Sequence, residues 1–411
     1  MDPKVPTGAH VAGDFHKWLM EPDKVAREVA AHPAYRDAVD AVKADAELVR
    51  IADRRFAGAS ISRWVSAEDL VTAAVAVAGV EIRCLALTPT PDLMASISLR
   101  NLLKQREVAR TGSTEAVTIL GFSGLSLEED QHVDLPWGRL TARVGWYGTG
   151  ELLRPTSCVL VSEHHRVSVG VSETMEAQKR DRLFAQYNNW IQLSSRLLSL
   201  AVALGTGPAR VAPIPTFQLT LLPYETPMGV GGPAVVAPPG VERRLTASEG
   251  AEIQRWAQVL AESYSPKLDV AARRITTALS HRIDPADRPI DAVTAWESLF
   301  SSQQDATLRV TGAIAWLLEP VNSSARDECH AEMTKIYGWR SAVVHGGEPK
   351  PEIVHSASLR ATEIAILAVG NLLTVRPELI PLKSKDRSRR LLLGLTDADK
   401  ASQLSEEPPG R

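Results

Sequence analysis

The chain has 411 residues, of which 44% are apolar and 23% charged, and its formal net charge is −3. This composition is typical of soluble globular proteins and excludes fibrous and disordered classes. The length predicts two or three folded units. Because the net charge is slightly negative, the chain has no global attraction to phosphate, and a broad surface that coats nucleic acid is not expected.

The expected compartment and cofactors follow from what the sequence lacks. Its 3 cysteines have no C-x-x-C spacing, which excludes a disulfide framework or a thiolate metal site. Residues 1–17 have no basic stretch before an apolar run, and we identify no segment approaching the ~20 apolar residues that span a bilayer. We therefore expect a cytoplasmic protein with no membrane contact, no metal and no other cofactor.

Residues 1–222 are predicted to form a domain of mixed α and β structure. Apolar residues recur at helical spacing over residues 14–55, with breaks at Pro22 and Pro33. A long helix is predicted over residues 173–204, where apolar residues share one face. Strands are predicted where apolar residues alternate with polar ones or β-branched residues gather: these are residues 80–84, 117–122, 167–171 and 217–222.

A linker is predicted over residues 223–245. Its first part, residues 223–241, holds five prolines and four glycines without any periodicity. Residues 246–380 are predicted to form an all-α bundle. At its start, Thr246 and Glu249 have the spacing of a capping box.

Within the bundle, Ser265 and Pro266 fit an N-cap followed by proline at the first helical position. The later helices are predicted from their apolar spacing at residues 290–300, 308–318, 324–345 and 356–375. Residues 381–411 are predicted to form a flexible tail, because the segments 383–390 and 397–411 are polar. Removal from residue 383 onward is then expected to leave folding intact, and the alternative is that the apolar segment LLLGL, residues 391–395, docks or pairs.

The segment most informative about chemistry is IYGWRSAVVHGG, residues 336–347. Arg340 is predicted to lie on an apolar helical stripe, so its guanidinium is aimed at the packing face. A buried charge is costly unless it is paired, and Arg340 therefore requires a carboxylate, a partner subunit or an anionic ligand. The other members of the stripe are Cys329, Met333, Ile336, Tyr337 and Val344.

His345 follows Arg340 by five positions, which is about 140° around a regular helix. The two side chains therefore share a surface only if the helix ends there. Gly346 and Gly347 predict such an end, because glycine adopts the left-handed conformation that closes many helices. Ser341, four residues before His345, is placed to hydrogen-bond nearby and fix the imidazole.

A structural role is the alternative for both residues. Arg340 would then form an ion pair with Glu297 or Glu319, and His345 would be a helix cap or a surface residue. Arg-x4-His on its own is a pattern that chance produces often. The surrounding sequence is what favours a functional interpretation.

That surrounding sequence contains a series of motifs in a fixed order. A helix with a paired-basic segment, Arg273-Arg274, comes first, and a turn with Asp287-Arg288 follows it. The next two motifs are an "ALE-x-L" helix, here Ala295-Trp296-Glu297-Ser298-Leu299, and an "R-x-A-x-LL" helix, here Arg309 through Ala313 to Leu317-Leu318. The last motif is "Y-x-x-RS-x-x-VHG", here Tyr337 to Gly346. Over residues 247–375 this order resembles the Apea-like branch of the HEPN (higher eukaryotes and prokaryotes nucleotide-binding) superfamily. Trp296 in place of leucine and a looser spacing from Arg309 to Ala313 depart from the pattern.

The resemblance implies a helical HEPN domain that cleaves RNA without a metal. In this chemistry a 2′-hydroxyl attacks the adjacent phosphate and leaves a 2′,3′-cyclic phosphate and a 5′-hydroxyl. Arg340 and His345 are the implied catalytic residues, and Ser341, Tyr337 and Glu297 the supporting ones. Histidine exchanges a proton near neutral pH and arginine stabilises phosphoryl charge. The resemblance also implies a homodimer through this domain.

The biological role expected from the resemblance is that of an antiviral or stress toxin. The amino-terminal domain would then sense an unknown trigger or restrain the nuclease. The alternative function is a non-catalytic HEPN scaffold for dimerisation or nucleotide binding. It is favoured by residues 246–380, which hold 13 Lys and Arg against 17 Asp and Glu, a net charge of −4. Any contact with RNA must therefore be local.

Overall fold

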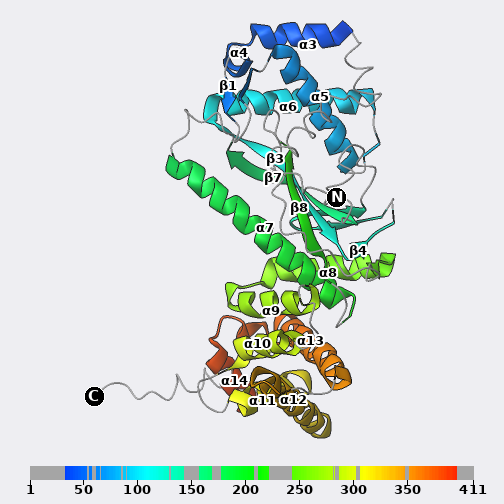
Figure 1. The fold of residues 1–411 in the computed structure, drawn as a ribbon, viewed down its shortest axis with the longest axis vertical. Coiled ribbons are helices and arrows are strands. Elements are labelled where there is room, and N and C mark those ends of the chain that lie inside the picture. The colour runs from blue at the N-terminus through cyan, green and yellow to red at the C-terminus, as the bar shows by residue number, and fades with distance from the viewer. Residues whose placement is uncertain are drawn as a thin grey trace, which may run out of the picture. The chain divides into compact units, whose positions relative to one another are not determined.

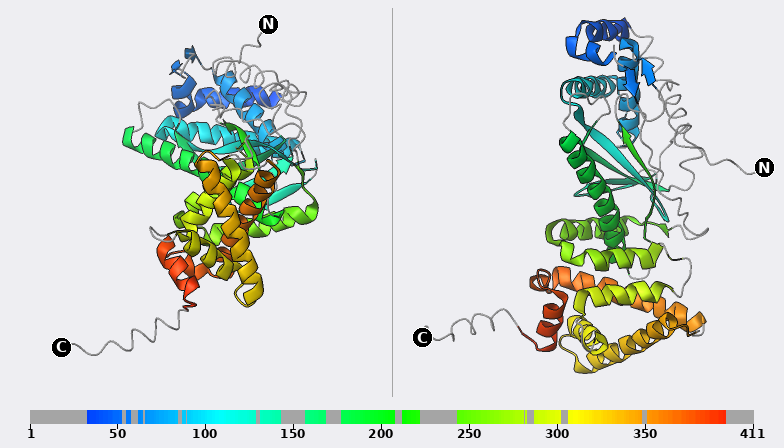
Figure 2. Two further views of the ribbon diagram at one scale, coloured as in Figure 1. Left: turned by 60° about the horizontal axis from the view of Figure 1, so that its bottom comes forward. Right: turned by 60° about the vertical axis from the view of Figure 1, so that its left-hand side comes forward.

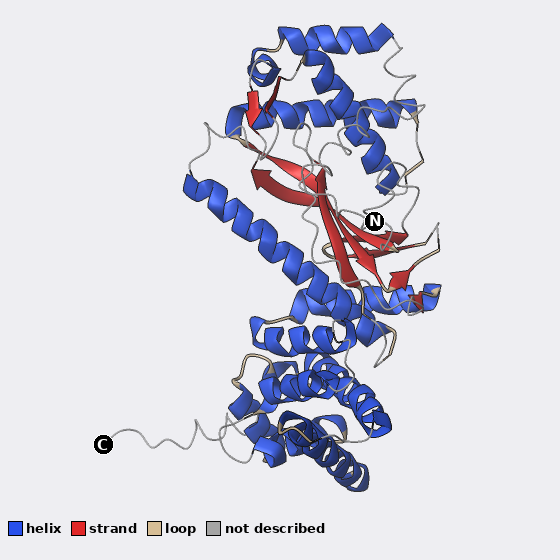
Figure 3. Cartoon of the chain, viewed as in Figure 1, coloured by secondary structure: helices blue, strands red, loops and turns tan. Residues whose placement is uncertain are grey.

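The computed structural model describes residues 33–52, 55–57, 62–64, 66–84, 87–88, 90–128, 131–142, 157–168, 177–207, 212–221, 243–280, 282, 287–301, 306–347 and 351–395. The chain divides into two compact units: unit 1 is residues 1–195 with 214–247, and unit 2 is residues 196–213 with 248–411. Unit 1 contains an antiparallel sheet and helices, whereas the described part of unit 2 is helical (Figure 3). The predicted class, mixed α and β structure followed by mostly helices, is confirmed at this level.

The described part of unit 1 begins with four helices and a short hairpin, β1 (Arg55–Ala57) with β2 (Ser62–Trp64). The two longer of these four helices, α5 and α6, pack against each other (Figure 1). Polar side chains of α6 support this packing, since Asn101 and Gln105 donate hydrogen bonds to backbone carbonyls of α5. The four helices are α3 (Pro33–Ala44), α4 (Ala46–Ala52), α5 (Ala67–Cys84) and α6 (Pro91–Thr111).

The rest of unit 1 is built on a five-stranded sheet with the order β5-β6-β7-β3-β8, in which every neighbouring pair is antiparallel. Strand β3 pairs on both edges, and its side chains Ile119, Leu120 and Phe122 are buried. Helix α7 (Ala177–Gly205) belongs to unit 1 up to residue 195, and this part contacts the sheet, because the Thr118 hydroxyl of β3 donates a hydrogen bond to the Tyr187 hydroxyl. The strands are β3 (Ser113–Ser123), β5 (His132–Leu135), β6 (Gly138–Ala142), β7 (Cys158–Ser168) and β8 (Ile214–Leu221).

The strand predicted at residues 80–84 is wrong, because these residues form the last turns of α5. The alternation there is only five residues long, and an alanine-rich helix-forming run precedes it. Helix α6 was not predicted, although its signals are in the sequence. The Thr90 hydroxyl accepts a hydrogen bond from Leu93 N, Pro91 opens the helix, and Gly112 ends it in the left-handed conformation.

Several predictions fall partly on residues outside the described set. These are the helical residues 14–32, the strand residues 169–171 and the helix residues 173–176. The predicted linker also lies there from 223 to 242. At its end, however, strand β9 (Arg243–Arg244) pairs in parallel with β4 (Leu125–Ser126), so these two residues belong to unit 1 rather than to a free linker.

Unit 2 is a helical bundle in which α10 packs against α9, α11 and α13 (Figure 2). Trp296 of α10 is fully buried, and its indole N–H donates a hydrogen bond to the Ala361 carbonyl of α13. The predicted cap at Ser265 is confirmed, since its hydroxyl accepts from Lys267 N. The helices are α8 (Ala247–Ser263), α9 (Asp269–Ser280), α10 (Arg288–Phe300), α11 (Ala306–Leu318), α12 (Ser323–Val344), α13 (Pro351–Thr374) and α14 (Ser384–Leu392), with 3-10 turns η1 (Pro266–Leu268) and η3 (Pro377–Leu379).

Helix α13 is long and apolar enough to cross a membrane by length and composition, which the sequence analysis missed. Most of this apolar window is buried within the protein, and Ile364, Ala365 and Val369 are fully enclosed. Its apolar length is therefore accounted for by its position in the core of the bundle.

The prediction of a flexible tail is wrong for residues 384–395, because α14 packs against α10 and α11. Arg387, Ser388 and Leu391 of this helix are buried. Gly312 of α11 allows the close approach, since a Cβ there would lie 3.0 Å from the Leu392 side chain. The buried side chains contradict the reason for expecting that removal of residues 383–411 leaves folding intact.

Candidate functional site

The Arg340–His345 segment occupies the last turn of α12 and the residues that close it. His345 is the C-cap, and Gly346 follows with a left-handed φ of 80°. Gly346 N donates to the Val343 carbonyl at 3.1 Å and Gly347 N to the Ala342 carbonyl at 2.8 Å. This pair of hydrogen bonds is a Schellman motif, so the predicted left-handed helix end is confirmed.

Gly346 and Gly338 of α12 allow a matched test of this helix end. A Cβ on either would meet no atom within 4 Å, so only the backbone conformation distinguishes them. Gly346→Ala is expected to destabilise the protein by about 1 kcal/mol, because alanine resists the left-handed region. Gly338→Ala is expected to stabilise it by about 1 kcal/mol, because alanine favours a helix interior. Thermal unfolding that shifts in the same direction for both variants would contradict this account.

Arg340 lies against α10, as its place on the apolar stripe predicts. Its Nη2 is 3.5 Å from Glu297 Oε2, and the two side chains are 24% and 25% exposed. This is one of the two ion pairs that the sequence left open, since Glu319 was the other candidate. The Nε of Arg340 is buried and has no hydrogen-bond partner among the described residues. Ion pairing therefore satisfies only part of this guanidinium.

Glu297 also binds Tyr337, so one carboxylate joins two residues of α12 to α10. The Tyr337 hydroxyl donates a hydrogen bond to Glu297 Oε1, and the Arg340 guanidinium carbon lies 5.9 Å from the centre of the Tyr337 ring. Burial raises the pKa of Tyr337 to about 12, and the hydrogen bond to Glu297 contributes to the rise. The phenol thus keeps its proton at neutral pH and acts as a donor to Glu297.

This raised pKa predicts a loss of stability in alkali. The unfolded chain releases the Tyr337 proton near the ordinary value of 10, whereas the folded chain holds it to about 12. Stability is therefore complete below pH 10 and decreases as the pH rises through that window. We expect Tyr337→Phe to be less stable than the wild type at pH 8, but to lose less stability between about pH 9 and about pH 11.5. Equal alkaline slopes in chemical denaturation would contradict the assignment.

His345 is exposed at the end of α12, apart from the Glu297 cluster. Its backbone N–H donates to the carbonyls of Ser341 and Ala342. Among the described residues, the Ser341 hydroxyl makes no hydrogen bond to the imidazole, so Ser341 supports this residue through its backbone. The structure thus brings together Arg340, Tyr337 and Glu297, whereas the exposed His345 ring has no side-chain partner among the residues that the structure describes.

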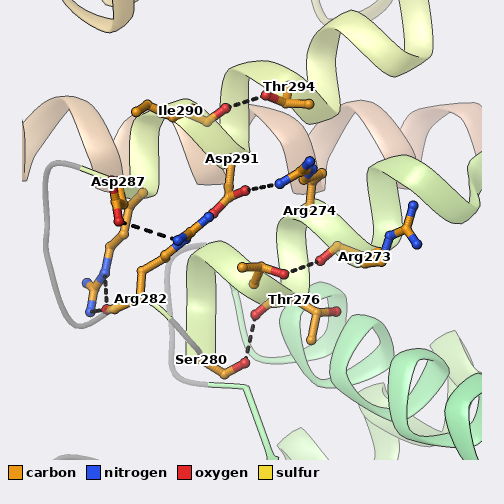
Figure 4. Close-up of polar contacts among 11 residues, drawn as sticks. Arg273, Arg274, Thr276, Ser280, Arg282, Asp287, Ile290, Asp291 and Thr294 are labelled. Atoms are coloured by element: carbon orange, nitrogen blue, oxygen red, sulfur yellow. Dashed lines mark hydrogen bonds and ion pairs between the residues drawn. The ribbon is translucent and has the colours of Figure 1, made fainter. Parts of the chain in front are cut away.

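One polar cluster of unit 2 was missed by the sequence analysis. Asp291 of α10 is fully buried, and it binds Arg274 of α9 and Arg282 of the following loop at 2.7 and 2.5 Å (Figure 4). Arg274 belongs to the paired-basic segment, and Asp291 follows the Asp287-Arg288 turn in the sequence. Asp291 itself gave no signal, because its burial depends on contacts between two helices.

In the part of the chain that the structure describes, no group of three or more His, Cys, Asp or Glu side chains is placed to hold a metal ion. Comparison of the chain with protein-family models, with curated proteins and with solved structures finds no match.

Proposed function

We propose that this protein is a metal-independent endoribonuclease, and that unit 2 is an Apea-like HEPN domain with Arg340 and His345 as its catalytic pair. The sequence motifs support the family assignment. The observation that carries the proposal is the end of α12, where a semi-buried Arg340 anchored by Glu297 is followed five residues later by an exposed His345. The five positions from Arg340 to His345 span about 7 Å along a helix. Their side chains are therefore close enough to contact the same phosphate group.

The proposed reaction is an internal transfer at one phosphate of the RNA. The ribose 2′-oxygen bonds to phosphorus and loses its proton, while the bond from phosphorus to the 5′-oxygen breaks and that oxygen gains a proton. His345 is positioned to exchange these protons with the RNA. Arg340 stabilises the charge on the phosphoryl oxygens, and Glu297 and Tyr337 fix its position.

The test is cleavage of a labelled single-stranded RNA by the purified full chain in excess EDTA. Cleavage is expected to persist, because the proposed steps need only proton transfer and charge stabilisation. Cleavage that stops in EDTA and returns with added Mg²⁺ would contradict the metal-independent mechanism. A protein that is well folded and leaves every RNA tested intact would contradict the nuclease itself.

The second candidate function is a non-catalytic HEPN scaffold for dimerisation or nucleotide binding. The observation favouring it is the Arg340–Glu297 ion pair, which gives Arg340 a structural role without any ligand. A scaffold tolerates loss of the His345 imidazole, whereas the nuclease does not. RNA cleavage therefore separates the two functions.

We also propose a homodimer through unit 2, with unit 1 responding to a trigger. Of the three kinds of partner that the sequence left open for Arg340, a carboxylate of the same chain is present, so Arg340 itself does not require a partner subunit. The remaining support is the family resemblance and the exposed Val344 beside His345. Light scattering is expected to give twice the mass of one chain at micromolar concentration without RNA. A monomer throughout that range would contradict the dimer.

A further inference from the structure

Where α9 is followed by α10 in unit 2, the arginine side chains outnumber the carboxylates that pair with them. Arg274 and Arg282 each bind one oxygen of the buried Asp291, and Arg282 also approaches Asp287 at 3.4 Å. Arg288 binds no carboxylate among the described residues, and its guanidinium donates to the Arg282 carbonyl. Figure 4 shows Arg274 and Arg282 reaching Asp291 from two sides.

Arg273 adds an exposed charge beside this group. Among the residues that the structure describes, its guanidinium has no hydrogen-bond or ion-pair partner, and in Figure 4 it extends away from Asp291. We define the corner cluster as Arg273, Arg274, Arg282 and Arg288 with Asp287 and Asp291. Its net charge is +2, and counting Asp284, which lies between Arg282 and Asp287 in the sequence, still leaves +1.

This excess contrasts with other exposed arginines between residues 246 and 380. Arg255 pairs with Glu252, and Arg360 pairs with Glu332 and Glu363. Residues 246–380 as a whole carry a net charge of −4. The corner cluster is therefore a local positive site within a segment of net negative charge, which is the form of RNA contact that the overall charge allows.

Asp291 holds the Arg274 and Arg282 side chains in place without neutralising the whole positive charge of the cluster. A guanidinium has five N–H donors in a rigid fork, and Arg274 uses one of them on Asp291. The Arg274 and Arg282 side chains remain 41% and 34% exposed. Both guanidiniums are thus partly exposed on side chains that a buried carboxylate holds in place, and both have donors that bind neither Asp291 nor Asp287. This arrangement is suitable for binding phosphate oxygens.

We propose that the corner cluster binds backbone phosphates of single-stranded RNA, on the strand that enters the Arg340–His345 site. This assignment of the strand rests on the proposed function. Asp291 and Glu297 both belong to α10 and lie six positions apart, which is about 9 Å along the axis and about a third of a turn around it. Phosphates held at the corner cluster would position the neighbouring scissile phosphate.

The test measures binding of a fluorescent 20-nucleotide 2′-O-methyl RNA to the full chain, by anisotropy over a series of salt concentrations. The methylated RNA lacks the attacking hydroxyl, so binding is read without cleavage. Each lost phosphate contact lowers the slope of log K against log salt by about 0.7, which at 0.1 M salt is about a fivefold loss. The double variant Arg273→Ala/Arg274→Ala is therefore expected to lose two contacts, about 25-fold in affinity and about 1.4 in slope.

A folding check and a control variant show whether a loss of affinity comes from lost phosphate contacts. The double variant leaves Asp291 paired with Arg282, and its thermal unfolding should show that it folds. Arg255→Ala is the matched control, because it removes an exposed arginine of unit 2 that already has a carboxylate partner; its affinity should equal that of the wild type. Wild-type affinity and slope in the double variant, or no binding by the wild type, would overturn the proposal. RNA binding without cleavage of ordinary RNA would overturn the nuclease and leave the corner cluster supported.

Discussion

Arg387→Ala is expected to destabilise unit 2 by about 4 kcal/mol, because it removes a buried guanidinium that three carbonyls depend on. Arg387 of α14 is 1% exposed. Its nitrogens donate to the carbonyls of Leu299, Leu379 and Ile380 at 3.3, 3.0 and 2.9 Å. Leu299 lies in the last turn of α10, whose carbonyls have no partner within the helix. Arg387 therefore caps α10 and attaches α14 to the bundle.

Burial lowers the pKa of Arg387, yet an arginine keeps its charge in a protein. The site thus holds a cation at a helix C-terminus, where the helix dipole favours it. Chemical denaturation of Arg387→Ala and of a chain ending at Leu382 should show comparable losses. Arg389→Ala is the matched control, because Arg389 is exposed on the same helix; it should change stability by less than about 0.5 kcal/mol. Equal stability of the Arg387 and Arg389 variants would contradict this role of α14.

His345→Ala is expected to lower RNA cleavage by at least about a hundredfold, the usual contribution of a general acid–base group. The imidazole is exposed and has no side-chain partner among the described residues, so its loss should leave the unfolding temperature unchanged. Cleavage of a labelled RNA under single-turnover conditions measures the effect. Wild-type cleavage by this variant would favour the scaffold function.

Arg340 requires a different control, because its loss also affects packing. Arg340→Ala strands the Glu297 carboxylate, whose remaining partner is Tyr337, and such a change can cost about 3 kcal/mol. Arg340→Lys keeps the charge beside Glu297 but loses the planar fork. We expect this variant to fold and to cleave RNA poorly. Full activity in Arg340→Lys would show that one positive charge is sufficient there.

The parts of the fold that local signals specify could be predicted from the sequence. Gly346 predicted the end of α12 because few other residues adopt a left-handed φ, and Ser265 with Pro266 predicted a helix start for a similarly local reason. The position of Arg340 on an apolar stripe predicted its contact with a neighbouring helix, and Glu297 is one of the partners that the sequence left open for it.

Features that depend on tertiary contacts could not be predicted in this way. The sequence KSKDRSRR resembles a solvated tail, since nothing local shows that Arg387 will meet three carbonyls from other segments. Asp291 likewise becomes a buried anchor only when α9 and α10 pack together. In α5 the helix continues through residues 80–84, where a short alternation had indicated a strand.

The most direct measurement of the central claim is the mass of the products that the full chain makes from a short RNA in EDTA. The account predicts a 5′ fragment ending in a 2′,3′-cyclic phosphate and a 3′ fragment beginning with a 5′-hydroxyl. It also predicts that an RNA with a single 2′-deoxynucleotide at the cleaved position remains intact there, because the attacking hydroxyl is absent. Products with a 5′-phosphate, or cleavage of the deoxy-substituted position, would contradict it.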